Sequence, residues 1–128
     1  MAGPDLPSPG FYRGNIVLLA DERTQSHAEF TAMCLQTAPS AVTIGSQTAG
    51  ADGNVSLVGL PGKISTYFSG IGVYYPDGAE TQKVGVRIDI TVRPTIVGIQ
   101  TGRDEVLEKA LEYLSERFGG SADREIVR

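Results

Sequence analysis

Hydrophobic and polar positions follow different periods along the chain, and each change of period marks an element. Residues 15–20 (NIVLLA) are apolar without alternation, which is typical of a strand covered on both faces of a sheet. From Ser26 to about Gln36 apolar residues recur at helical intervals, and Pro39 ends the pattern. Residues 41–45 (AVTIG) predict a second strand. This order predicts a βαβ unit with parallel strands and a right-handed crossover.

The middle of the chain is rich in glycine and contains short β-branched and aromatic runs. Three of these runs, NVSLV, KISTYF and GVYY, predict an irregular β-rich segment with hairpins between residues 45 and 85. In the loop that begins this segment, Gly45, Gly50 and Gly53 are expected to adopt positive φ angles.

A strand and a long helix are predicted to complete the fold. Residues 87–92 (RIDITV) alternate and precede Pro94, which indicates a strand near the edge of a sheet. From about Asp104 to Phe118 the apolar residues form one helical stripe, and two glycines follow it. Thr101 and Asp104 are spaced as a capping box at the start of this helix.

Length and composition indicate one globular domain. The chain has 128 residues, of which 41% are hydrophobic and 20% charged, values near the average for proteins with a single core. We expect a linker or loop at residues 1–10, the domain at residues 11–120 and a flexible tail at residues 121–128. The prolines and glycines at the start suggest a chain that begins partway through a larger protein. Neither a membrane-spanning run nor a signal peptide is predicted.

Several classes of chemistry are disfavoured by charge and spacing. The net charge is −4, and the eleven basic residues are scattered, so no nucleic-acid surface is expected. The single Cys34 fits no metal-ligand spacing, and neither do Asp77, Glu80, Asp89 and Asp104. The glycine-rich loop matches neither a P-loop nor a dinucleotide-binding turn. We therefore expect no metal and no other cofactor.

Candidate chemistry is concentrated in residues 24–29 (TQSHAE). In one interpretation Ser26 only caps the helix and Glu29 reaches back to it, as in a capping box. In the other, the Ser26 hydroxyl lies at the positive end of the helix dipole, and the N–H of His27 can donate to an oxyanion. Neighbouring side chains project about 100° apart on a helix, so the His27 ring is poorly placed to accept the serine proton.

Four blocks of sequence point to a known family. They are GNIVLLADERTQSHAEFTAMCLQ, AVTIGSQTAGADG, GVYYPDGAETQKVGVRIDITVRPT and GRDEVLEKAL, which together extend from about Phe11 to Leu114. In this order they resemble the C-terminal part of the catalytic domain of C-terminal processing peptidases, the tail-specific serine proteases related to the tricorn core protease. The resemblance implies an α/β fold of the Clp protease/crotonase-like kind. Its parts would be the βαβ core, the glycine-rich β segment and the C-terminal helix.

The resemblance also implies site residues and a reaction. It implies peptide-bond hydrolysis by acyl transfer on a polypeptide substrate, with Ser26 as the nucleophile and His27 N–H as one oxyanion donor. The second donor is usually a glycine from an upstream strand and loop that this chain does not contain. Tricorn-like sites recruit a late acidic residue, for which Glu80 is the nearest candidate and Gln82 the alternative position.

The chain departs from the family at the position of the catalytic base. Members with a serine-lysine dyad carry the lysine in a Gly-x-x-Thr-x-Gly-Lys-Gly stretch. Here Gly45, Thr48 and Gly50 align with that stretch, and Ala51 stands in place of the lysine. The base is then either a histidine upstream of this chain or lost. A smaller departure is Ile88, where the family often has proline.

Three functional hypotheses follow. The first is a fragment of a serine-type peptidase, with little activity by itself, whose base comes from the missing N-terminal part of the parent protein or has been lost. The second is a non-catalytic peptide- or ligand-binding module of the same fold, which Ala51 favours. The third is self-association through sheet edges left open by truncation. Family members with this architecture are commonly exported or periplasmic, and we expect the same of the parent.

Overall fold

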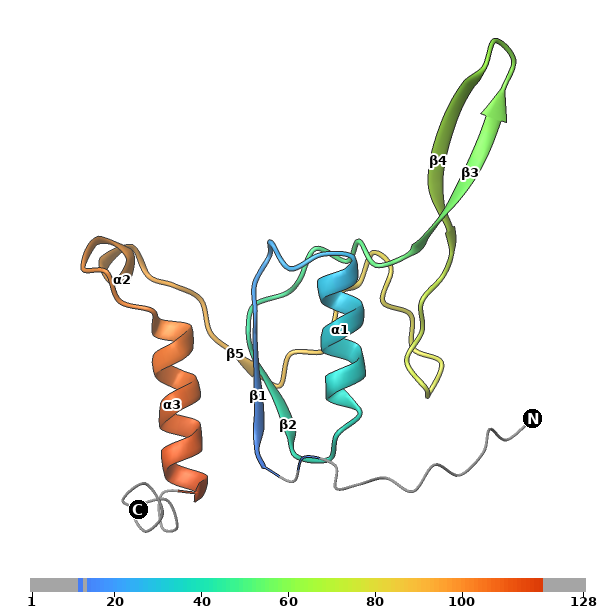
Figure 1. Cartoon of the computed structure of the whole chain (residues 1–128). Helices are drawn as coiled ribbons and strands as arrows, with labels where there is room; N and C mark the ends of the chain where they lie inside the picture. The colour runs from blue at the N-terminus through green and yellow to red at the C-terminus, as the bar shows by residue number, and fades with distance from the viewer. Residues whose placement is uncertain (1–11, 13, 119–128) are drawn as a thin grey trace, which may run out of the picture.

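The computed structural model describes Tyr12 and residues 14–118 (Figure 1). Along the chain the elements are β1 (Ile16–Ala20), α1 (His27–Gln36), β2 (Ala41–Gly45), β3 (Asn54–Leu60), β4 (Ile64–Ile71), β5 (Ile90–Thr91), α2 (Ile96–Gln100) and α3 (Glu105–Phe118). The linker predicted at residues 1–10 and the tail predicted at residues 121–128 lie outside the described residues. Within the described part, every helix is too short or too polar to cross a membrane.

Strands β1, β2 and β5 form a parallel sheet with β2 in the centre. Ile16 of β1 lies opposite Ala41 of β2, and Ile44 lies opposite Ile90 of β5. The predicted parallel βαβ unit and the predicted edge strand are both confirmed, although the edge strand is shorter than the alternating run. Figure 1 shows α1 on one side of the sheet and α3 on the other.

The prediction that the first strand is covered on both faces is wrong. Within β1 only Ala20 is buried, and Leu19 remains 45% exposed. The reason is the placement of the helices, since α3 packs against β1 and β2 whereas α1 packs mainly against β2. The best-covered positions of the sheet are therefore Thr43 and Ile44 in the central strand, both fully buried.

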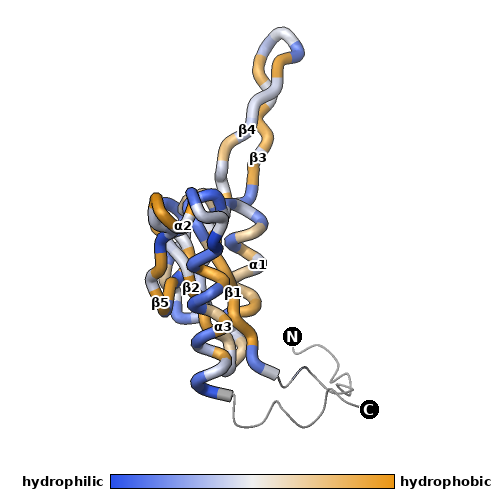
Figure 2. Tube along the Cα trace, turned by 90° about the vertical axis from the view of Figure 1, so that its left-hand side faces the viewer, coloured by the Kyte–Doolittle hydropathy of each residue, from blue (hydrophilic) through white to orange (hydrophobic). Residues whose placement is uncertain are grey.

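The glycine-rich segment forms a long hairpin of β3 and β4 that projects from the rest of the molecule (Figure 1). The predicted hairpin is confirmed, with Leu57 opposite Tyr67 along its length. Apolar and polar positions are interspersed on it (Figure 2), and both of these residues are more than 70% exposed. The third predicted run, GVYY, forms only an isolated bridge between Tyr74 and Glu80.

Two of the three glycines have the predicted backbone conformation. Gly45 has a φ of 144° and Gly50 a φ of 64°, whereas Gly53 has no positive φ. The prediction for Gly53 is wrong because this residue leads directly into the extended backbone of β3. Gly45 allows a close approach, since a Cβ there would lie 1.8 Å from the carbonyl oxygen of Ala20.

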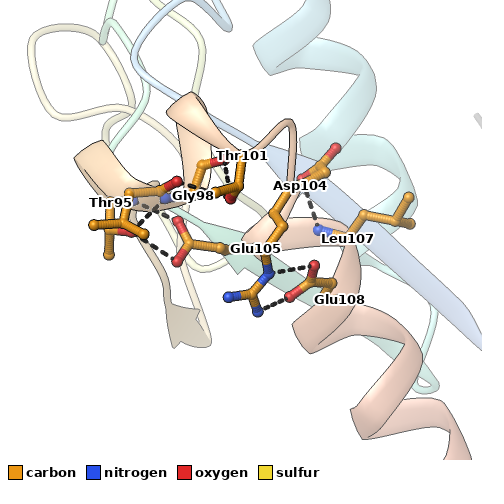
Figure 3. A network of polar contacts seen from close by, with 9 residues as sticks. Thr95, Gly98, Thr101, Asp104, Glu105, Leu107 and Glu108 are labelled. Carbon is orange, nitrogen blue, oxygen red and sulfur yellow. Dashed lines mark hydrogen bonds and ion pairs between the residues drawn. The ribbon is translucent and has the colours of Figure 1, made fainter.

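The C-terminal part contains a short helix that the sequence pattern did not indicate. Helix α2 begins after Thr95, whose hydroxyl accepts a hydrogen bond from Gly98 N–H at 2.9 Å (Figure 3). Asp104 precedes α3 and accepts from Leu107 N–H at 2.9 Å. The predicted Thr101–Asp104 capping box is wrong, because Thr101 ends α2 and donates its hydroxyl to the Val97 carbonyl.

The main apolar cluster lies between α1 and the segment that follows the hairpin. Its buried members are Met33, Tyr75 and Val86. Tyr75 also carries polar contacts, since its hydroxyl donates to Gln36 Oε1 at 2.6 Å and accepts from Arg87 N–H at 3.0 Å. These contacts fix the C-terminal end of α1 and thereby the direction of its N-terminal end.

Candidate active site

Ser26 occupies a sharp turn between β1 and α1. Its φ of 53° and ψ of −121° lie outside the regions that non-glycine residues normally adopt, and such a conformation costs about 1–3 kcal/mol. The residue is exposed. Strained turns from a strand into a helix occur in hydrolases because they present a serine hydroxyl above the surrounding backbone.

The strained turn is held by the buried carboxylate of Glu29. Oε2 of Glu29 accepts hydrogen bonds from the N–H groups of Ser26 at 3.0 Å and Ala51 at 2.9 Å. Oε1 accepts from Gly50 N–H at 2.8 Å and from the Thr48 hydroxyl at 2.6 Å. Glu29 has no exposed surface, and a buried carboxylate requires such a set of donors. It therefore links the serine turn to the loop after β2.

The predicted capping box is present in both directions, since the Ser26 side chain faces the backbone N–H of Glu29 and the Glu29 side chain reaches back to the Ser26 N–H. Ser26 and Glu29 stand in the capping-box positions, and the Glu29 carboxylate accepts the N-cap N–H. The contact of the Ser26 hydroxyl with the Glu29 N–H falls short of a capping hydrogen bond. The hydroxyl thus remains available for another partner, while His27 N–H occupies a first-turn position without an intrahelical acceptor.

A cavity of about 270 Å³ opens beside Ser26. Its walls come from the start of α1 and from the two ends of the hairpin, and they consist of Ser26, His27, Phe30, Asp52, Gly53, Asn54 and Val73. The His27 ring is exposed and stacks with Phe30, with 6.3 Å between the ring centroids. We call this cavity the Ser26 pocket.

Asp52 is a buried acid in the wall of the Ser26 pocket that the sequence analysis missed. It is only 5% exposed. Burial raises the pKa of its carboxyl, and the charge of Glu29 raises that pKa further. A hydrogen bond from Gly53 N–H and the charge of His27 act in the opposite direction.

The structure brings Ser26 and His27 together in one pocket but places Glu80 elsewhere. Glu80 is exposed and lines a different cavity, of about 400 Å³, together with Arg87 and Arg93. Gln82 lies closer to the Ser26 pocket, since its Nε2 is 3.4 Å from where a Cβ on Gly53 would stand. The catalytic roles of Ser26, His27 and Glu80 stay predictions.

The sequence showed where the helix would begin but not what surrounds its first turn. Glu29 was interpreted as a local cap, whereas three of its four donors lie about twenty residues further along the chain. Asp52 had no pattern of its own, although it directly follows Ala51, the position in the family motif where lysine is missing.

Comparison with known proteins shows the family to which this chain belongs. The sequence profile of peptidase family S41 matches residues 5–92. The chain belongs to peptidase family S41, a family of serine peptidases. A sequence search of curated proteins finds no match.

Solved structures share the fold of this chain. Mature CPAF complexed with lactacystin is 28% identical with a TM-score of 0.71, and the match covers 82% of this chain and 21% of CPAF. A Parabacteroides merdae protein described as a peptidase is 24% identical with a TM-score of 0.72, covering 80% of this chain and 32% of that one. The tricorn protease is 18% identical with a TM-score of 0.70. The match covers 82% of this chain and 10% of the tricorn protease.

These comparisons confirm the α/β fold of the Clp protease/crotonase-like kind. The chain spans about a third or less of the length of these proteins.

Proposed function

We propose that the protein takes part in peptide-bond hydrolysis by acyl transfer, with Ser26 as the nucleophile. The observation that carries the proposal is the strained, exposed Ser26 turn beside an open pocket in a chain of family S41. A purely structural cap would not require the positive φ, because N-cap residues normally adopt an extended backbone.

In this reaction the Ser26 Oγ attacks the carbonyl carbon of a polypeptide, and its proton passes to a base. The negative charge on the carbonyl oxygen is stabilised by His27 N–H at the start of α1. Collapse of the tetrahedral intermediate expels the amine, which takes up the proton, and leaves an ester on Ser26. Water then hydrolyses the ester and regenerates the hydroxyl.

The base and the second oxyanion donor are proposed to come from outside the described residues. Among the residues that line the Ser26 pocket there is no lysine, and His27 is the sole histidine. Loss of a single oxyanion donor costs roughly 3 kcal/mol in transition-state stabilisation. The chain by itself is therefore expected to turn over substrate slowly or not at all.

An alkyl fluorophosphonate tests this proposal in the complete gene product. The reagent should label the peptide that contains Ser26, and Ser26→Ala should abolish the labelling. Ser46→Ala is a matched control, because Ser46 is buried and donates its hydroxyl to Glu22 at 3.1 Å. Labelling that survives Ser26→Ala would remove Ser26 from this role.

The second candidate is a non-catalytic peptide- or ligand-binding module of the same fold. Ala51 favours it, because this position lacks the lysine of serine-lysine members and its N–H is engaged by Glu29. A binding module would take up a peptide in the Ser26 pocket without reacting with the fluorophosphonate. The same labelling experiment therefore separates the two functions.

A further inference from the structure

Among the described residues, a single buried side-chain polar atom lacks a hydrogen-bond partner. It is Oδ2 of Asp52, a residue that lines the Ser26 pocket. Glu29, the other buried acid nearby, is fully paired by four donors. A buried carboxylate oxygen without a donor is unfavourable, and a group that supplies a donor would remove that cost.

The charges around Asp52 indicate what kind of donor is missing. Glu29 and His27, both on α1, are the titratable groups whose charges act on Asp52. Glu29 adds negative charge, and neither lysine nor arginine lines the pocket. A positively charged group would compensate this excess and form a charge-assisted hydrogen bond with Oδ2.

The shape of the Ser26 pocket suits a long side chain with an apolar stem. Phe30 and Val73 contribute apolar side chains to its lining, and Asp52 contributes a carboxyl group. A volume of about 270 Å³ is at the small end for ligand sites and is sufficient for one side chain. Lysine and arginine combine a hydrocarbon stem with a cationic head.

We propose that Asp52 determines specificity by binding the ammonium or guanidinium group of a basic substrate side chain. This side chain belongs to the residue whose carbonyl Ser26 attacks, because Ser26 lies in the same pocket wall. The inference rests on the proposed function, since it assumes that a peptide carbonyl reaches Ser26.

The preference for a basic residue should depend on pH in a defined direction. Binding of a cation requires the ionised carboxylate of Asp52. Burial and the charge of Glu29 raise the pKa of this carboxyl, while Gly53 N–H and His27 lower it, with a net upward direction. The preference should therefore be lost as the pH falls through a pKa above that of an ordinary aspartate.

The test compares two peptidyl diphenyl phosphonates on the complete gene product. Both phosphonylate a reactive serine, and they differ only in the side chain beside the phosphorus, which is that of lysine or of norleucine. We expect the lysine probe to label Ser26 about 10-fold faster or more, as for a hydrogen bond to a charged group. Asp52→Asn should reduce this ratio to near one. Asp77→Asn, at an exposed aspartate paired with Arg87, should leave it unchanged.

Three results would overturn the role of Asp52. They are equal rates for the two probes in the wild type, an unchanged ratio in Asp52→Asn, and an equal slowing of both probes in that variant. If Asp52→Asn does not fold, the test is the ratio of the two labelling rates in the wild type, measured as a function of pH. A ratio that stays constant down to the pKa of ordinary aspartates contradicts the inference. Failure of the alkyl fluorophosphonate to label Ser26 would instead refute the proposed function.

Discussion

Glu29→Gln tests the link between the buried carboxylate and the serine turn. The substitution keeps the shape of the side chain but replaces one acceptor oxygen with an NH₂ donor. If the NH₂ takes the place of Oε2, it faces the N–H groups of Ser26 and Ala51, and both lose their acceptor. If it takes the place of Oε1, the Thr48 hydroxyl can turn to accept from the amide, and Gly50 N–H is the one backbone donor left unpaired. The second orientation costs less.

The expected cost follows from that orientation. One buried N–H without an acceptor costs about 1–3 kcal/mol, and three bonds that change from charge-assisted to neutral lose about 1 kcal/mol each. The smaller desolvation cost of a neutral amide offsets part of this sum. We expect the free energy of unfolding to fall by about 3 kcal/mol.

Urea unfolding of the complete gene product measures this change, and fluorophosphonate labelling of Ser26 measures its effect on the site. The labelling rate of folded Glu29→Gln should fall, because the Ser26 turn loses the anion that holds it. Glu116→Gln, at an exposed position on α3, is the matched control and should change neither quantity. A loss below about 1 kcal/mol together with normal labelling would refute the positioning role.

Three further predictions concern the fold. Gly45→Ala should lower the free energy of unfolding by more than about 3 kcal/mol or prevent folding, because its methyl group would overlap the Ala20 carbonyl; an unchanged urea midpoint would contradict this. Tyr75→Phe should cost about 2 kcal/mol at neutral pH through two lost hydrogen bonds. Burial raises the pKa of Tyr75, so the wild type should lose stability as the pH rises above about 10, and the variant should lose less in urea titrations at each pH. Replacing Leu57 and Tyr67 together by serine should leave stability almost unchanged, since both are exposed. Light scattering on the wild type and the double variant would then show whether the hairpin mediates self-association. If it does, the double variant should have a lower mass in solution than the wild type.

Local patterns predicted the elements that local interactions determine. The βαβ unit follows from a change between strand and helix periods, and α1 begins after Ser26 as its capping pattern indicates. Helix α2 was missed because IVGIQ is short, β-branched and has no amphipathic repeat. The capping box at Thr101 and Asp104 was wrong because the intervening residues end one helix before the next begins.

The site was predictable only in part, because its contacts join distant segments. Ser26 and His27 are neighbours in sequence, so their common location could be expected. Glu29 receives donors from the loop after β2, and Asp52 reaches the same pocket from the end of that loop. Neither contact can be recognised from a single sequence. Both depend on how the loop after β2 packs against the start of α1.

The most direct test of the central claim is to trap the acyl-enzyme. The complete gene product would be mixed with an activated ester of a basic peptide, quenched in acid, digested and mapped by mass spectrometry. We predict that the peptide containing Ser26 gains the mass of the acyl group, and that Ser26→Ala loses both the adduct and the hydrolysis. Hydrolysis that continues in Ser26→Ala, or an acyl group found on another residue, would contradict the account.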